Sequence, residues 1–303
     1  MDLKWFGLSL VSTISKDHFL DYYQDLAKKQ WLKKEQLEQL QLHKLKRLLS
    51  HSIQNVPFYQ RRFTGFDPSS IKNLNDIKNL PILTKEELKK GGAEAIAKNQ
   101  KRLLAKTTSG TTGPPFTFMI SRNFFSLEIA RNLRIFDLPG FTLGEPWVLF
   151  TPLRGKKSFL FSFLTNRLVL DANQITIKRT PPCCPSAINN RLEPDEDMIR
   201  HFCKRIQKHK PKAIYSYPSA LIALATFIRK WSIKEINIRI IISSGEVLTS
   251  GIRTYLEETF KGEVFNLYGT TEFPAVAEEC KEHNGLHIFA DSYLVEFINQ
   301  GKL

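Results

Sequence analysis

Three short polar loops carry the side chains that could bind a nucleotide. The first loop, Thr107 to Pro115, combines hydroxyl groups with two glycines. Glycine lets backbone amides approach an anion closely, and hydroxyls add donors to phosphate oxygens. The loop is not a Walker A sequence, which places four residues between its glycines and then Gly-Lys-Ser/Thr. Taken alone, a loop of this composition is more often a turn than a phosphate site.

The second loop, Tyr268 to Glu272, follows an apolar stretch. Its tyrosine ring can lie against a purine, Thr271 can reach a phosphate, and the Glu272 carboxylate can help to hold Mg²⁺. The third loop, Ser244-Gly245-Glu246, offers a tight backbone passage beneath a planar base. Each of these loops is also consistent with an ordinary exit from a strand, so neither decides the function alone.

The elements around these two loops predict a parallel sheet. An isoleucine-rich strand is expected over Ile236–Ile242, and a helix capped by Thr249 or Ser250 is expected to end at Gly262. Glu263–Leu267 is predicted as the next strand. Strand, helix and strand with short connections form a right-handed crossover. Ligands bind beyond the carboxyl ends of such strands, which is where both loops lie.

The rest of the chain indicates an α/β protein with a helical beginning. Residues 1–100 are expected to form a mostly helical lead-in, and residues 101–303 an α/β core. Within the lead-in, apolar spacing predicts a helix over Glu35–Ile53, and Thr84 with Glu87 forms a capping box. The remaining predicted elements are strands at Phe116–Ile120, Trp147–Thr151 and Ala213–Tyr215, and helices at Phe124–Phe136, from Asp197 onward, and at Ser219–Trp231.

Composition excludes several classes of protein. The chain has 303 residues, of which 42% are hydrophobic and 24% charged, and this is typical of a globular protein. A formal charge of +14 favours anionic ligands. Basic residues are not clustered or interleaved with aromatics, so no nucleic-acid partner is expected. No window of about 18 apolar residues could span a bilayer, and we expect a cytoplasmic protein with reduced cysteines and no membrane insertion.

One cluster of residues raises the alternative of a second metal. Cys280 and His287, with His283 between them, are weak zinc candidates. Their spacing does not match a zinc finger, and only three ligands are local. Surface histidines beside a buried cysteine are the simpler interpretation.

The three loops, in this order and spacing, resemble those of the adenylate-forming superfamily of acyl-CoA synthetases, adenylation domains and luciferases. Within it the chain is most similar to the phenylacetate–CoA ligase branch, which includes CapK-like proteins and a deazaflavin-coenzyme adenylyltransferase. The resemblance covers residues 40–303. It is carried further by Asn55–Tyr59 (NVPFY), Leu80–Lys85 (LPILTK), Tyr217–Ser219 (YPS), Glu279-Cys280 and Gly285–Ile288.

The resemblance implies an α/β fold, the large N-terminal domain of such an enzyme, with stacked mixed sheets and flanking helices. It implies activation of an aryl carboxylic acid by ATP with Mg²⁺ to an acyl-adenylate, and then transfer to CoA. The residues implied are Thr108, Ser109, Gly110, Thr111, Thr112 and Gly113 at the phosphates; Ser244, Gly245, Glu246, Tyr268, Gly269 and Thr270 at the rest of the nucleotide; Thr271 and Glu272 in catalysis, with Glu272 on Mg²⁺; and Tyr215, Tyr217 and Pro218 at the acyl pocket.

The sequence also departs from this pattern. Where relatives carry a lysine after the first loop, it has Pro114 and Phe116, although Lys106 lies nearby. The resemblance also implies a ribose-binding Thr-Gly-Asp and a C-terminal lid domain with a catalytic lysine. We expect neither within these 303 residues, which predicts a C-terminal truncation that impairs activity. A predicted strand at Tyr293–Ile298 and a turn at Asn299–Gly301 suggest an ending within a hairpin, whose bare edge would favour self-association, for example as a homodimer.

Three other functions remain open at this level. One is a catalytically reduced, CapK-like protein that binds a nucleotide or a partner in polysaccharide biosynthesis. A second is an adenylyltransferase acting on a coenzyme, and a third is a basic binding module without enzymatic activity. ATP binding would exclude the basic module, and acid-dependent pyrophosphate exchange would separate an enzyme from a reduced binder.

Overall fold

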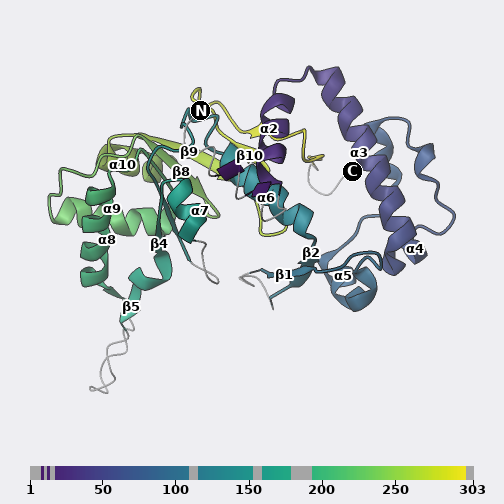
Figure 1. Cartoon of the computed structure of the whole chain (residues 1–303), viewed down its shortest axis with the longest axis horizontal. Helices are drawn as coiled ribbons and strands as arrows, with labels where there is room; N and C mark the ends of the chain where they lie inside the picture. The colour runs from purple at the N-terminus through teal and green to yellow at the C-terminus, as the bar shows by residue number, and fades with distance from the viewer. Residues whose placement is uncertain are drawn as a thin grey trace. The chain divides into compact units, whose positions relative to one another are not determined.

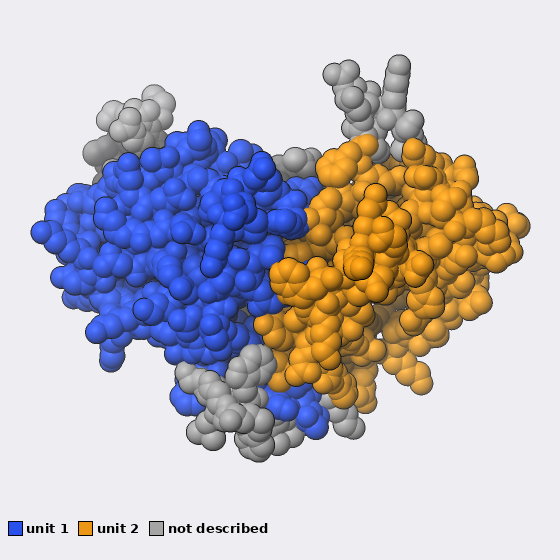
Figure 2. All heavy atoms as spheres, turned by 90° about the horizontal axis from the view of Figure 1, so that it is seen from above, with its two compact units in different colours: residues 1–16, 132–270, 277–287 blue, residues 17–131, 271–276, 288–303 orange. Residues whose placement is uncertain are grey.

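The computed structural model describes residues 8–9, 12–13, 18–108, 115–152, 159–178 and 193–297. The chain divides into two compact units (Figure 2). Unit 1 comprises residues 1–16, 132–270 and 277–287, and unit 2 comprises residues 17–131, 271–276 and 288–303. The expected boundary near residue 100 stays a prediction.

A seven-stranded sheet with the order β11-β10-β9-β8-β7-β3-β4 forms the centre of unit 1 (Figure 1). Strands β4, β3, β7, β8 and β9 run parallel, and β10 is antiparallel to β9. Every residue of β8 is buried, as expected for a parallel strand covered on both faces. The strands are β3 Trp147–Thr151, β4 Arg167–Asp171, β7 Ala213–Ser216, β8 Ile240–Ser244, β9 Glu263–Tyr268, β10 Ala277–Glu278 and β11 His287–Ile288.

Three amphipathic helices pack on one face of this sheet and form its main core. They are α8 Glu196–His209, α9 Pro218–Lys230 and α10 Ser250–Phe260. In α8 the predicted apolar face is confirmed, because Ile199, Phe202 and Ile206 are buried while His201 is exposed. The smaller elements of unit 1 are α7 Phe159–Leu164, η4 Ala172–Ile175, β5 Thr176–Lys178 and β6 Glu193–Pro194.

The predicted β8–α10–β9 crossover is present, with one correction. The strand begins at Ile240 rather than Ile236. Ile236 and Ile238 are buried in the core, which explains their alternation with polar residues, but the amide of Ile238 donates to the carbonyl of Phe260 at the end of α10. This segment is therefore held by a backbone hydrogen bond to the end of a helix and not by hydrogen bonds to a neighbouring strand.

The ends of α10 also follow from particular residues. The Thr249 hydroxyl accepts a hydrogen bond from the amide of Ile252, so Thr249 rather than Ser250 is the cap. Gly262 follows the helix because the backbone passes very close to the Ile238 carbonyl. A Cβ at position 262 would lie 2.0 Å from that oxygen.

Unit 2 is mostly helical and includes a short hairpin. The predicted helix is confirmed as α3, and the Thr84–Glu87 capping box opens α5. Strand β1 pairs antiparallel with β2, and β1 has no counterpart among the predicted elements. The elements are α2 Phe19–Lys29, α3 Lys34–Asn55, α4 Pro57–Arg62, η1 Pro68–Ser70, η2 Leu74–Asn79, α5 Lys85–Gly91, η3 Gly92–Ala95, β1 Leu104–Thr107, β2 Thr117–Ile120 and α6 Arg122–Arg134, the last three residues of which belong to unit 1.

The last described segment of unit 2 is not a strand, contrary to the prediction. Tyr293 to Phe297 are irregular, and Ile298 and Asn299–Gly301 lie outside the described residues. The reason is how Tyr293 is held. Its hydroxyl donates to the Pro274 carbonyl at 2.6 Å, its own carbonyl accepts from the Gln41 side chain at 3.0 Å, and the Arg131 guanidinium lies 4.7 Å from its ring. These contacts fix the segment without a strand partner.

Candidate functional site

The Ser244–Glu246 loop lies at the carboxyl end of β8, as predicted, and its glycine is required by a close contact. Gly245 has φ +82°, a region that favours glycine. A Cβ added there would lie 2.5 Å from the ring of Tyr217. Two residues from separate predicted groups, the nucleotide loop and the acyl pocket, are therefore in contact in unit 1.

Glu246 joins the same loop to the start of α9. Its carboxylate accepts hydrogen bonds from the backbone amide of Ser219 at 2.8 Å and from the Ser219 hydroxyl at 2.7 Å. A carboxylate at the N-terminus of a helix accepts hydrogen bonds from the free amides of the helix and interacts favourably with the positive end of the helix dipole. Glu246 thus positions Pro218, the first residue of α9, and its predicted contact with the nucleotide stays a prediction.

Two tyrosines flank this loop with different surroundings. Tyr215 in β7 is half-buried and hydrogen-bonds through its side chain to Ser244. Burial raises the pKa of Tyr215 to about 12, so its hydroxyl keeps its proton at neutral pH. Tyr268 ends β9, and 58% of the residue is exposed.

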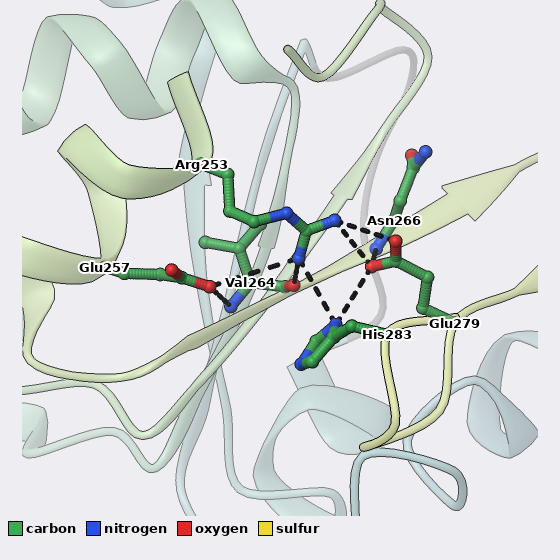
Figure 3. A network of polar contacts seen from close by, with 6 residues as sticks. All are labelled: Arg253, Glu257, Val264, Asn266, Glu279 and His283. Atoms are coloured by element: carbon green, nitrogen blue, oxygen red, sulfur yellow. Dashed lines mark hydrogen bonds and ion pairs between the residues drawn. The ribbon is translucent and has the colours of Figure 1, made fainter. Parts of the chain in front are cut away.

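A network of charged and polar groups holds β9 against its neighbours (Figure 3). One Arg253 nitrogen donates to both carboxylate oxygens of Glu279, at 2.7 and 2.8 Å, and another donates to the Val264 carbonyl. Glu279 also accepts from the backbone amide of Asn266 at 2.8 Å. Helix α10, strand β9 and the segment after β10 are joined through these groups.

The same network accounts for one of the weak zinc candidates. The Nδ1 atom of His283 lies 3.3 Å from the Glu279 carboxylate and 3.3 Å from Arg253. Across the described residues, no group of three or more His, Cys, Asp or Glu side chains is arranged to hold a metal ion. The structure therefore offers no support for zinc at Cys280 and His287.

In unit 2 the structure describes the base of the loop that is predicted to bind phosphate. The Thr108 amide donates to the Phe116 carbonyl at 2.9 Å, and the Phe116 amide donates to the Thr108 hydroxyl at 3.0 Å. This pair closes the loop at its two ends. Ser109, Gly110, Thr111, Thr112 and Gly113 lie outside the described residues.

Two lysines near this loop differ in their partners. The ammonium of Lys106 lies 2.6 Å from the carboxylate of Glu128, a residue that is 4% exposed. The charge of Lys106 is therefore paired with a buried carboxylate. Lys85 at the start of α5 lies 3.6 Å from the Glu272 carboxylate, and its ammonium stands 5.4 Å from the centre of the Phe116 ring. The structure thus places a cation at Phe116, where the sequence lacks one.

Sequence reasoning did not assign a role to Lys85. The only signal was its place in the Leu80–Lys85 stretch of the resemblance, because Lys85 and Glu272 are far apart in the chain. Thr271 and Glu272 belong to unit 2, whereas Tyr268 to Thr270 belong to unit 1.

The chain has the fold of the adenylate-forming CoA ligases. It superposes on 2-hydroxyisobutyryl-CoA ligase, solved in complex with 2-HIB-AMP and CoA, with a TM-score of 0.65 at 20% identity over 85% of this chain and 55% of that one. An open conformation of the same ligase gives a TM-score of 0.61. These likenesses establish the fold.

Curated relatives confirm the resemblance inferred from the loops. The phenylacetate–coenzyme A ligase of Thermus thermophilus is 26% identical over 88% of this chain and 58% of its own length. The ligase of the same name from Escherichia coli is 24% identical, with 88% and 59% covered. Protein CapK of Staphylococcus aureus is 23% identical, with 81% and 53% covered. No family model matches the chain.

These relatives are longer than the chain. The chain spans less than two thirds of the length of each of them. Among the described helices, none combines the length and the apolar composition needed to cross a membrane.

Proposed function

We propose that this chain carries the ATP-binding part of a carboxylic acid–CoA ligase that activates an aryl acid in the cytoplasm. The observation that carries the proposal is the contact of Gly245 with Tyr217 at the carboxyl end of β8. It joins a nucleotide motif to an acyl-pocket motif in a chain whose relatives are phenylacetate–CoA ligases.

In the proposed reaction a carboxylate oxygen of the acid attacks the α-phosphorus of ATP and pyrophosphate leaves. The exposed Tyr268 side chain would lie against the adenine, near the Ser244–Glu246 loop at the end of the neighbouring strand β8. The Thr108 loop would donate hydrogen bonds to the phosphates. Lys85 would neutralise their charge, since Lys106 is committed to Glu128. Positioning and charge stabilisation of this kind supply most of the rate in phosphoryl chemistry.

Glu272 is suited to Mg²⁺. Its carboxylate is partly exposed and its ionic contact with Lys85, at 3.6 Å, is loose enough to exchange for a metal ion. Mg²⁺ is usually held by one or two carboxylates together with substrate phosphates, so a single protein ligand fits. When bound, the ion would offset negative charge on the phosphates.

Acid-dependent exchange of labelled pyrophosphate into ATP tests the proposal. The 303-residue chain is incubated with ATP, Mg²⁺ and a panel of aryl and short-chain acids. We expect exchange with an aryl acid and a marked loss of it in Gly245→Val, whose side chain would collide with Tyr217. Absence of both ATP binding and exchange would refute the proposal.

The relative CapK favours a second candidate function. The match to CapK covers 81% of this chain. A CapK-like member of the family could bind a nucleotide or a protein partner in polysaccharide biosynthesis without catalysing a reaction. Calorimetric binding of ATP with no exchange for any acid of the panel would favour this second function over the first.

A further inference from the structure

Glu278 in β10 is a buried carboxyl without a hydrogen-bond partner. Its side chain is 0% exposed, and among the described residues neither carboxyl oxygen has a partner. Burying a polar group without a partner is costly, so proteins keep few such groups, and many of those belong to functional sites. The proposed reaction as described above gives Glu278 no role.

The register of the sheet places Glu278 beside the candidate site. Ser244 of β8 pairs with Leu267 of β9, and Leu267 pairs with Glu278 of β10. Paired residues of neighbouring strands point to the same face, so Ser244 and Glu278 share a face at the carboxyl end of β9. Tyr215 lies on this face as well, because its partner in β8 is Ile242, two residues before Ser244.

Tyr215, Ser244 and Glu278 also interact electrostatically. Tyr215 hydrogen-bonds to Ser244, and the charge of Glu278 helps to raise the pKa of the tyrosine. Burial raises the pKa of Glu278 well above its ordinary value, Asp137 raises it further, and Arg134 opposes them. The raised pKa favours the protonated carboxyl, and a protonated carboxyl can both donate and accept a hydrogen bond.

We propose that Glu278, with Tyr215 and Ser244, forms a polar end of the acyl pocket that selects an acid bearing a hydroxyl group on its ring. This inference rests on the proposed function. A ring hydroxyl fits because it can donate one hydrogen bond and accept another, and a protonated carboxyl can do the same. An aliphatic side chain would fill the space without an unpaired polar group, so a purely structural position would not favour glutamate.

Binding of non-hydrolysable acyl-adenylate analogues tests the inference without requiring turnover. The probes are acyl-sulfamoyl adenosines made from phenylacetate, from its 2-, 3- and 4-hydroxy derivatives and from its 4-amino derivative. Calorimetry on the 303-residue chain compares the wild type with Glu278→Gln, Glu278→Leu and a control, Glu263→Gln, which changes an exposed glutamate of β9.

In the wild type we expect one hydroxylated analogue to bind about tenfold more tightly than the unsubstituted one, the effect of one buried hydrogen bond. Glu278→Leu should abolish this preference, Glu278→Gln should keep part of it, and Glu263→Gln should keep all of it. Melting temperatures show whether each variant is folded, and removing an unpaired carboxyl should not lower that of Glu278→Leu.

Equal binding of the hydroxylated and plain analogues by the wild type would overturn the inference and leave the proposed function intact. The same holds for a preference that survives in Glu278→Leu, or for tightest binding of the amino analogue. Failure of every analogue and of ATP to bind would instead overturn the proposed function itself, and the inference with it.

Discussion

At the scale of single residues, Gly245 is the position where backbone conformation and packing coincide. Its φ of +82° and the Tyr217 ring 2.5 Å from an added Cβ leave no room for a side chain. We expect Gly245→Ala to lower the free energy of unfolding by roughly 1–3 kcal/mol and to weaken ATP binding. Urea unfolding and calorimetry measure the two effects.

Gly251 provides the matched control for this prediction. It lies inside α10, and a Cβ there meets nothing within 4 Å. Gly251→Ala should stabilise the protein by up to about 1 kcal/mol through helix propensity and leave ATP affinity unchanged. Similar effects of the two substitutions would show that the contact with Tyr217 is not important.

The charge on Lys85 gives a second prediction at this scale. Because Lys85 stands between Phe116 and Glu272, we expect Lys85→Met to weaken ATP binding by roughly threefold to tenfold, with little change in melting temperature. Lys90→Met, an exposed lysine in the same helix, should have no effect on affinity. Equal losses in both variants would indicate a general field effect rather than a specific contact.

At the scale of elements, the Arg253–Glu279 pair joins α10 to β9. Burial raises the pKa of Glu279, but hydrogen bonds from Arg253 and from the Asn266 amide more than offset this and hold its pKa below 4.5. The pair therefore stabilises the fold fully above about pH 4.5, and this contribution is lost as pH falls through the lowered folded-state pKa.

The variant Glu279→Gln tests this linkage. We expect it to lower the free energy of unfolding by roughly 1–3 kcal/mol at pH 7, since it removes the charge from the hydrogen bonds with Arg253. The free energy of unfolding of the variant should also fall less steeply than that of the wild type between pH 5 and pH 3, within about one unit of the ordinary pKa of a glutamate. Urea titrations at pH 7, 5 and 4 measure both effects. If the variant loses stability with falling pH as steeply as the wild type, the acid dependence of stability arises from other carboxyl groups.

The elements also show what could be predicted from the sequence. Helix α8 and the β8–α10–β9 crossover were predicted because local periodicity and capping agreed with their final environments. Strand β1 was missed because Leu104 to Thr107 are stabilised by pairing with β2, which local pattern does not reveal. Ile236 and Ile238 were misassigned because alternating burial also occurs in an irregular segment that packs on a helix end.

Part of the candidate site could likewise be predicted from the sequence, and part could not. The loops at Ser244 and Tyr268 could be located, since glycines and polar residues directly after apolar stretches indicate strand ends. The partners of their side chains could not. Lys85 with Glu272, and Glu246 with Ser219, are set by tertiary structure between segments that carry no mutual sequence signal.

At the scale of the whole molecule, the chain spans 58% of the length of the Thermus thermophilus relative. We expect the purified 303 residues to bind ATP and to form CoA thioester far more slowly than about 1 per second, a rate within the usual range for enzymes. The resemblance places a lysine needed for catalysis in the remaining part of such enzymes, and one positioned group is worth roughly 10² to 10³ in rate.

Parallel measurement of AMP and thioester with ATP, Mg²⁺, CoA and the acid panel checks this expectation. AMP release without thioester would agree with it. Thioester formed at about 1 per second would show that the 303 residues suffice for both half-reactions.

The contacts of Tyr293 have a consequence for the order in which the protein is made. Gln41, whose side chain holds the Tyr293 carbonyl, precedes it by 252 residues. At roughly 5–20 residues per second, a ribosome takes about 13 to 50 s to cover that distance. Helix α3 therefore leaves the ribosome long before the residue that completes its surroundings. During this interval the surface of unit 2 that later contacts Tyr293 is open to chaperones and to neighbouring nascent chains.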